Sequence, residues 1–279
     1  MQKHTRPIFK RFPLDGHVTI AGEKLTTPYH VYDGAMLCLG GTVAGNMASA
    51  LLAREHLFPV LDTRGRALAA IWVCDFTDAN LGAHHELQIS LFATSRPSQD
   101  LPAHPFVYFR ALATLPDLQM VCHGLWNNTQ RVVDYNVEHL RLDAAMTSSK
   151  IDRDGGAWAF GFRDSKGNLI AEGAVSPPAQ LSLAQAWGLT RQMGLLGTLR
   201  LARAPAANIP VVNTRGPADS LNLVCQTYTT SERQHIRTAG PHDRIAIRHP
   251  LYERLEFEAR FVQQLEGVGF IFLRPVPLT

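Results

Sequence analysis

Short segments with the hydrophobic pattern of β-strands recur along this sequence, and they constrain its fold more than any other feature. Residues 67–75, 87–93 and 105–112 are apolar runs or alternate apolar with polar side chains. Residues 157–162 and 168–175 flank Asp, Ser and Gly residues that favour a turn, so they predict a hairpin. Runs of this length and period are typical of strands, and we expect a strand-rich fold.

Helices are predicted at a few places between the strands. Residues 43–55 carry helix formers with apolar side chains at positions 47, 50, 51 and 52, and Thr42 can cap this helix. Residues 116–124 begin with Pro and end with Gly, the asymmetry of a short helix. Residues 184–203 contain glycines that weaken a helix, so this stretch is expected to be partly helical. Further strands are predicted at 221–228, 244–248, 255–262 and 268–274.

The composition is that of a packed protein. With 279 residues, 46% of them hydrophobic and 18% charged, the chain can bury the core of one large domain or two small ones. The four cysteines are widely spaced and three lie in apolar runs, where buried free thiols are common. No disulfide framework or zinc knuckle is therefore expected.

Charge and hydropathy argue against several partners and locations. The net charge of +3 comes from 27 basic and 24 acidic residues that are dispersed along the chain, so nucleic acid is not an expected partner. No apolar run approaches the roughly 20 residues that span a bilayer. The basic N-terminus is not followed by the apolar segment of a signal peptide. We therefore expect a soluble, cytoplasmic protein with no membrane partner.

An acidic side chain stands at the start of the apolar strand that ends at residue 93. Alternation with a period of two places His84 and Glu86 on one face of this strand and His85 on the other. A histidine and a carboxylate on one wall of an apolar cavity suit proton transfer, because burial raises the pKa of the glutamate. Glu86 is the candidate acid or base, and His84 would orient it or share its proton. The alternative is a salt bridge at a sheet edge or a solvated turn.

A second group of polar residues lies at the end of the second predicted helix and in the loop that follows it. Asn127, Asn128 and Arg131 can bind a carbonyl, enolate or carboxylate and stabilise charge that develops in a transition state. Trp126 can line the site of an aromatic or polyketide-like substrate, and His123 completes the group of candidate substrate-binding residues. Alternatively, the asparagines only form the turn after the helix and Trp126 packs in the core.

No metal or cofactor is expected. Neighbouring histidines on a strand, such as His84 and His85, point to opposite faces and cannot both bind one ion without a bulge. The paired motif His-Glu-x-x-His does not occur. Gly40, Gly41 and Gly45 are not followed by the Lys-Ser/Thr of a phosphate-binding loop, and no strand is followed by Gly-x-Gly-x-x-Gly.

The segment Leu-Gly-Ala-His-His-Glu-Leu at 81–87 and the order of the elements around it carry a family resemblance. The segment is similar to the Gly-x-Tyr-x-Glu region of the acetoacetate decarboxylase superfamily, with Glu86 at the position of the family's active-site glutamate. The surrounding elements also follow the order of that superfamily: a helix at 43–55, residues 57–60, a strand at 66–76, then a strand at 106–112 and a helix at 117–123.

This resemblance implies an α+β, mostly antiparallel fold in which a large cone-shaped sheet is surrounded by peripheral helices. It also implies a single domain over residues 1–279, with residues 1–24 as an N-terminal extension, and a small-molecule carbonyl substrate. Residues 255–262 alternate apolar and charged side chains, which leaves one face of that strand for solvent or a partner. Together with the habit of the superfamily, this pattern suggests a homo-oligomer.

The chain departs from the superfamily at its most reactive position. In members that form a Schiff base, a lysine in the loop after the helix condenses with the substrate ketone, and a lowered pKa makes it nucleophilic. No lysine occurs between Glu86 and Ser149. Arg131 cannot replace it, since a guanidinium stays protonated. Lys150, the nearest lysine, lies in a segment that resembles an exposed turn, where a lysine keeps its ordinary pKa.

We therefore expect lyase-like acid and base chemistry without a Schiff base. The reaction classes are decarboxylation, dehydration, retro-aldol cleavage or cyclisation of a small β-keto or polyketide-like substrate, as in secondary metabolism. The alternative is a catalytically silent ligand-binding or assembly protein of the same fold. A third possibility, an unrelated β-sandwich or lipocalin-like carrier, would place Glu86 on the outside.

Overall fold

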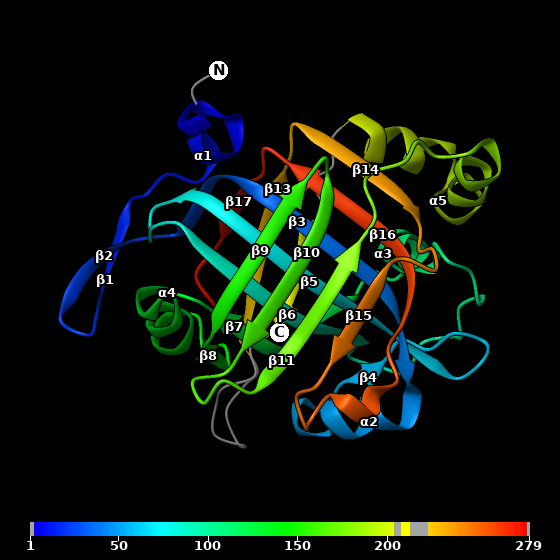
Figure 1. Ribbon diagram of the computed structural model, residues 1–279, viewed down its shortest axis with the longest axis horizontal. Helices are drawn as coiled ribbons and strands as arrows, with labels where there is room; N and C mark the ends of the chain where they lie inside the picture. The colour runs from blue at the N-terminus through cyan, green and yellow to red at the C-terminus, as the bar shows by residue number, and fades with distance from the viewer. Residues whose placement is uncertain (1–2, 204–207, 213–222, 278–279) are drawn as a thin grey trace.

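The computed structural model describes residues 3–203, 208–212 and 223–277, and a large sheet that closes on itself lies at its centre (Figure 1). Each strand of this ring pairs with the next, and the last pairs again with the first. The strands pair antiparallel, except that β12 is parallel to β7, which confirms a mostly antiparallel sheet. In ring order the strands are β3 (Tyr29–Ala44), β5 (Arg66–Ala79), β6 (His84–Thr94), β7 (Gln119–Asn127), β12 (Asn208–Val212), β13 (Leu223–Thr230) and β17 (Gly269–Phe272).

Additional strands extend the ring at its margins. They are β16 (Glu258–Glu266) on β3, β14 (Arg233–Thr238) on β16, β4 (Phe58–Pro59) on β6, β8 (Ala144–Met146) on β7 and β18 (Val276–Pro277) on β13. A hairpin of β1 (Gly16–Ile20) and β2 (Glu23–Thr27) projects at the left of Figure 1. A second sheet lies in front of the ring in the same view, in the order β15 (Arg244–Ile247), β11 (Leu169–Val175), β10 (Ala157–Arg163) and β9 (Ser148–Asp154).

The helices lie around the sheets rather than between ring strands. They are α1 (Pro7–Arg11), α2 (Gly45–Leu52), α3 (Val107–Thr114), α4 (Gln130–Asp134) and α5 (Leu183–Arg203). The short turns η1 (Lys3–Thr5), η2 (Ala53–Glu55), η3 (Tyr135–His139) and η4 (Glu253–Leu255) complete the set. Within the described part of the chain, no helix has both the length and the apolar character that a membrane crossing requires. A mostly β, α+β fold with peripheral helices is confirmed.

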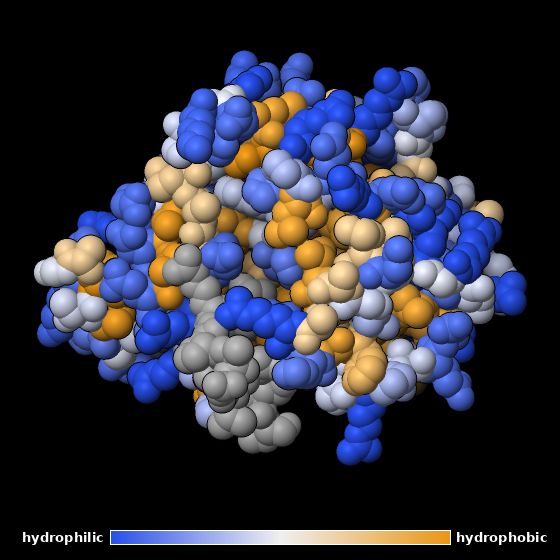
Figure 2. All heavy atoms as spheres, turned by 90° about the horizontal axis from the view of Figure 1, so that it is seen from below, coloured by the Kyte–Doolittle hydropathy of each residue, from blue (hydrophilic) through white to orange (hydrophobic). Residues whose placement is uncertain are grey.

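Alternation along the ring strands separates two hydrophobic cores. Side chains that point into the ring, such as Cys74 and Met120, form an inner cluster. Side chains that point outward, such as Val73, pack against the second sheet, where Phe162 is fully buried. Burying one phenylalanine contributes about 2–3 kcal/mol, so this outer core holds the two sheets together. Seen from below in Figure 2, hydrophobic atoms gather in the middle of the face and hydrophilic atoms form its margin.

Several sequence predictions agree with these elements. The strands predicted at 67–75 and 87–93 are β5 and β6, and the predicted hairpin is β10 with β11. The helix predicted at 43–55 begins later, since β3 continues to Ala44 and Thr42 pairs within the sheet instead of capping. The stretch 184–203 is helical as α5, with a break at Gly194, whose φ is 73°.

Two neighbouring predictions are wrong, and in opposite senses. The sequence predicts a strand at 105–112, but these residues contain the start of α3, whose Tyr108 and Phe109 reach the inner core. It predicts a helix at 116–124, but these residues enter β7, which is buried along most of its length between β6 and β12. Aromatic residues favour strands only weakly, and tertiary packing determined the secondary structure that each of the two segments adopts.

The C-terminal strands are confirmed with shifted limits. Residues 244–248 and 268–274 contain β15 and β17, and 221–228 contains the start of β13, although residues 221 and 222 lie outside the described residues. The strand predicted at 255–262 begins only at Glu258, as β16. Phe261 and Val262 are both buried, so the expectation of one open face fails for this part of the strand. All four cysteines are buried and outside any disulfide, which agrees with the buried thiols expected in the apolar runs.

Candidate active site

Glu86 points into the ring from the start of β6. In the sheet register it lies opposite Cys74 of β5 and Asn127 of β7. Its apolar surroundings destabilise the charged carboxylate, and this burial raises the pKa of Glu86 to about 7 although the hydrogen bond from Asn127 lowers it. A carboxyl with this pKa can both accept and donate a proton near neutral pH. The inward position also argues against the carrier fold that would place Glu86 outside.

A relay of two asparagine amides holds the Glu86 carboxyl. Asn127 Nδ2 donates to Glu86 Oε2 over 3.0 Å, and Asn136 Nδ2 donates to Asn127 Oδ1 over 2.9 Å. Both asparagines are buried, with Asn127 at 0% exposure. Because Asn136 occupies the amide oxygen of Asn127, the amide nitrogen of Asn127 is the end that faces Glu86. Asn136 comes from η3, a π-helical turn, a conformation often found at functional sites.

His84 shares the inner face with Glu86 but has other partners. Its Nδ1 lies 2.9 Å from the carbonyl oxygen of Gly82, which can only accept, so Nδ1 carries the proton. Its Nε2 lies 2.7 Å from the hydroxyl of Tyr29. Burial lowers the pKa of His84 to about 4, so the ring is neutral at pH 7 and Nε2 accepts the Tyr29 hydrogen. Neither nitrogen of His84 is therefore available to orient Glu86, and Asn127 takes that place.

The side chains on the inner face near Glu86 differ in burial. Glu86 is half-buried as a residue, although its carboxyl lies deep among other residues. Trp72, two residues before Cys74 on β5, also keeps partial exposure, and its buried Nε1–H has no acceptor. Gln88 lies opposite Trp72 in the register, and its amide Nε2 donates to the hydroxyl of Ser90 over 2.6 Å. The indole of Trp72 thus supplies an unused hydrogen-bond donor on the wall that carries Glu86.

The opposite face of β6 carries His85, as the period of two predicts. His85 Nδ1 lies 2.9 Å from Ser149 Oγ of the second sheet, and its Nε2 lies 3.5 Å from Asp75. Asn128 accepts from the backbone nitrogen of His85 over 2.7 Å, so its side chain fixes the strand end instead of facing Glu86. Bonding to His85 and Arg153 lowers the pKa of Asp75, although its burial opposes this effect. This cluster joins the two sheets.

The other predicted substrate-binding residues lie away from Glu86. Trp126 faces the outer core, opposite Leu87 in the register, and its ring packs at right angles to that of Tyr252. His123 Nδ1 lies 2.9 Å from the hydroxyl of the same Tyr252. Arg131 is exposed and forms two hydrogen bonds with Glu23 of the β1–β2 hairpin. Of the predicted set, only Asn127 meets Glu86, because the segment forms a strand whose successive side chains alternate between faces.

Sequence reasoning did not identify Asn136, Tyr29 or Trp72. Asn136 and Tyr29 occur in segments without a motif, and Trp72 resembles any other apolar strand residue. The period of two could have placed Trp72 on the face of Glu86 once the register of β5 and β6 was known. The contact of Tyr29 with His84 spans 55 positions in the sequence and leaves no local signal.

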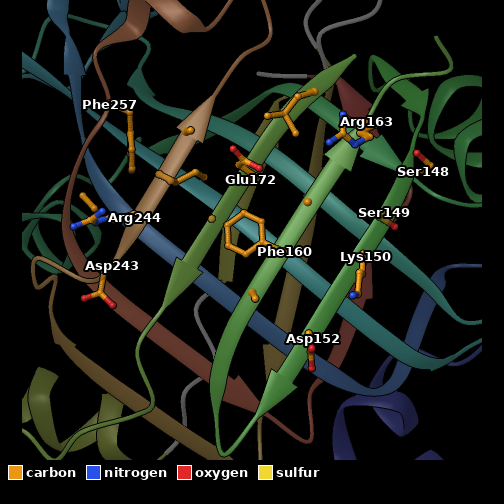
Figure 3. Close-up of a pocket in the computed structure, with 17 residues that line it drawn as sticks. Ser148, Ser149, Lys150, Asp152, Phe160, Arg163, Glu172, Asp243, Arg244 and Phe257 are labelled. Carbon is orange, nitrogen blue, oxygen red and sulfur yellow. The ribbon is translucent and has the colours of Figure 1, made fainter. Parts of the chain in front are cut away.

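No described lysine side chain is buried. Lys10, Lys24, Lys150 and Lys166 are all exposed, and the side chain of Lys3 lies outside the described part. Lys150 stands on β9, beside a surface groove of about 1040 Å³ that runs over the second sheet (Figure 3). This groove lies across the outer core from Glu86 and has side chains of both charges on its walls. Among the described residues, no group of three or more His, Cys, Asp or Glu side chains is arranged to hold a metal ion.

Known structures share this architecture. An acetoacetate decarboxylase from Legionella pneumophila superimposes with a TM-score of 0.62 at 9% sequence identity, over 98% of this chain and 95% of its own. The chain has an acetoacetate decarboxylase-like fold. The enduracididine biosynthesis enzyme MppR, in its complex with pyruvate, matches with a TM-score of 0.55 at 11% identity, over 91% of each chain.

A third structure adds to this likeness. An acetoacetate decarboxylase-like enzyme from Sphingomonas wittichii has a TM-score of 0.50 at 12% identity, over 90% of this chain and 92% of its own. No protein-family model matches the sequence, and a search of curated proteins found no match. The acetoacetate decarboxylase-like fold inferred from residues 81–87 and the element order is therefore confirmed, although these structures share little sequence identity with the chain.

Proposed function

We propose that this chain is a lyase-like enzyme in which Glu86 moves a proton next to the carbonyl of a small substrate. The support is Glu86 itself, which lies on the inner face of the ring, is half-buried and is hydrogen-bonded by an amide of fixed orientation. A pKa of about 7 leaves much of the group ionised at neutral pH while keeping it basic enough to remove a proton. An exposed glutamate, with its pKa near 4.3, would be a far weaker base.

The proton transfer can be followed atom by atom. The free Oε atom of Glu86 takes a hydrogen from the carbon next to the carbonyl, and the electron pair of that C–H bond forms an enolate. The protonated Glu86 then returns the hydrogen to carbon or to a leaving hydroxyl, which departs as water. Dehydration uses these steps. In retro-aldol cleavage Glu86 instead takes the hydrogen of the β-hydroxyl, the C–C bond breaks to give an aldehyde or ketone and an enolate, and the protonated Glu86 returns the hydrogen to the enolate carbon.

The proposed reaction does not use a Schiff base. A lysine that forms an imine at neutral pH needs burial or a neighbouring cation to lower its pKa. The four lysine side chains that the structure describes are exposed, and none lies between Glu86 and Ser149 in the sequence. Acid and base catalysis by a carboxyl group supports rate gains of about 100- to 10,000-fold without any covalent intermediate.

Hydrogen exchange at carbon tests this proposal with simple ketones in place of the natural substrate. Butanone and 4-hydroxybutan-2-one are incubated in D₂O with the protein, and NMR follows the loss of signal from hydrogens next to the carbonyl. The wild type is expected to accelerate exchange, and Glu86→Gln is expected to lower the rate at least about 100-fold. Glu172→Gln, at an exposed position of β11, serves as the matched control and should leave the rate unchanged. Full activity of Glu86→Gln would show that Glu86 is not the base.

A separate experiment tests the absence of an imine. Borohydride is added during incubation with butanone, and mass spectrometry then examines all five lysines. No lysine is expected to gain the mass of the reduced ketone adduct. A modified Lys150 would overturn the acid and base mechanism. If neither ketone exchanges hydrogen yet both bind, the alternative of a catalytically silent ligand-binding protein replaces the proposed function.

A further inference from the structure

A small pocket with an arginine from each end of the chain lies between α1 and the β1–β2 hairpin. Its volume is about 330 Å³, and it also borders the segment that follows β17. Both α1 and the hairpin lie on the left side of Figure 1. A volume of this size falls at the lower end of the range of small-molecule sites. The walls carry Arg11 and Arg274, together with the carboxylate of Asp15.

The two arginines have hydrogen-bond donors that the protein leaves unused. Both side chains are exposed, and in the described part of the chain no carboxylate or carbonyl oxygen accepts from either guanidinium. Asp15, although it lies on the same wall, forms no ion pair with Arg11 or Arg274 among these residues. The guanidinium of Arg11 lies over two aromatic rings, 5.0 Å from the centre of Phe12 and 5.5 Å from that of Tyr228. These rings favour a fixed position for its charge.

A third positive charge acts on the same region. His139 of η3 lies next to the pocket, with its Nε2 3.3 Å from the hydroxyl oxygen of Thr27. The pKa of His139 is lowered first by burial and then by the positive charges of Arg274 and Arg141. The imidazole is therefore neutral at pH 7, and the surrounding arginines favour an anion rather than a cation at this place.

The floor and the remaining walls suit the organic part of such an anion. Thr27 forms a buried floor with 4% exposure, and its Oγ1 accepts a hydrogen bond from the hydroxyl of Tyr135 over 3.0 Å. Phe12 and Leu273 add apolar surface to the walls. Since the Thr27 hydroxyl is already bonded within the protein, the arginines supply the free donors. A guanidinium binds carboxylate and phosphate groups through paired, charge-assisted hydrogen bonds.

We propose that this pocket binds a small organic anion, whose carboxylate or phosphate lies between Arg11 and Arg274 and whose apolar part contacts Phe12 and Leu273. The pocket adjoins the relay that holds Glu86, because Tyr135 is followed in η3 by Asn136. None of the residues that line the pocket belongs to that relay. The proposal therefore does not depend on the reaction assigned to Glu86.

Isothermal titration calorimetry tests the pocket with phenyl phosphate and benzoate, and with benzyl alcohol as the uncharged comparison. At least one of the two anions is expected to bind with a dissociation constant of about 1 mM or lower, and the alcohol is expected not to bind. The tighter anion identifies the head group. Arg11→Gln and Arg274→Gln should each raise its dissociation constant at least about 10-fold, through the lost charge-assisted hydrogen bonds. Arg96→Gln is the matched control, since Arg96 is exposed beyond the far end of β6.

Arginine labelling of the wild type gives a second measurement, which does not need any variant to fold. Phenylglyoxal modifies exposed arginines, and mass spectrometry compares the labelling with and without the tighter anion. At ten times its dissociation constant, labelling of Arg11 and Arg274 should fall to about a tenth, whereas Arg96 should be labelled as before.

Three results would overturn the proposal. The first is that neither anion binds. The second is binding that neither glutamine variant weakens and that leaves the labelling of Arg11 and Arg274 unchanged, since the anion then lies elsewhere. The third is inorganic phosphate that binds as tightly as phenyl phosphate, because the apolar walls then contribute nothing and the ligand is not an organic anion.

Discussion

Replacing Glu86 by glutamine should stabilise the protein at alkaline pH while removing its proposed activity. The enclosed carboxyl is costly only when it is charged, and glutamine has nearly the same shape without a charge. The hydrogen bond from Asn127 survives the change, since the glutamine oxygen also accepts. Residues that serve catalysis often lower the folding stability of a protein in this way.

The size of the effect follows from the pKa of Glu86. Burial raises this pKa from its ordinary 4.5 to about 7. Each pKa unit is worth about 1.4 kcal/mol, so the charged state costs up to about 3 kcal/mol of folding free energy. The partial exposure of the residue reduces this penalty, and we expect about 2 kcal/mol.

The pH dependence has a definite sign. Because the folded pKa is raised, the folded protein holds a proton that the unfolded chain releases between about pH 4.5 and 7. The contribution of Glu86 to stability is therefore fully present below pH 4.5 and is lost as the pH rises to 7. Glutamine does not titrate, so the difference in stability between Glu86→Gln and the wild type should be near zero at about pH 4.5 and largest at about pH 8.

Urea unfolding at several pH values measures this difference. The free energies of unfolding of the wild type and of Glu86→Gln are compared between about pH 4.5 and 8, with Glu172→Gln as the control at an exposed position. Other titrating groups contribute equally to both proteins and cancel in the difference. If the free energies of unfolding of Glu86→Gln and of the wild type depend on pH in the same way, the pKa of Glu86 is ordinary. The proposal that Glu86 is the base is then refuted.

Three further changes have expected outcomes. Asn127→Ala removes a donor that favours the carboxylate, so the pKa of Glu86 should rise and the midpoint of the pH–rate profile for hydrogen exchange should move above about 7. Tyr29→Phe should cost about 1 kcal/mol in urea unfolding, through its lost hydrogen bond, without moving that midpoint. Asp243→Asn weakens the buried ion pair with Arg237 and should cost about 3–5 kcal/mol, and a loss below about 1 kcal/mol would show that the pair is dispensable.

The sequence predicted the strands whose pattern is complete within a few residues. β5, β6 and the β10–β11 hairpin follow from runs of apolar or alternating side chains, since a strand repeats every two residues whatever surrounds it. The same repeat placed Glu86 and His84 together on one face and His85 on the other. The absence of lysine from residues 87–149 is likewise a fact of sequence alone, and the proposal of chemistry without an imine rests on it.

Two elements show where local reasoning fails. The aromatic residues of α3 and the Pro and Gly around β7 were weak signals, and each segment adopted the form that its position in the core required. Once β7 is a strand, Asn127 and Trp126 must point to opposite faces. The wrong helix prediction therefore grouped substrate-binding candidates whose side chains the observed strand places on opposite faces.

The sequence by itself determined which side of its strand Glu86 occupies and that no lysine stands near it in the chain. Only the tertiary structure decided which groups surround the carboxyl. Asn127 lies 41 positions away and Tyr29 contacts His84 from 55 positions away, so both contacts depend on how distant strands pair. The physical reason is that the direction of a side chain is a property of the local backbone, whereas burial and hydrogen-bond partners, which set the pKa of Glu86, arise only when the sheet closes.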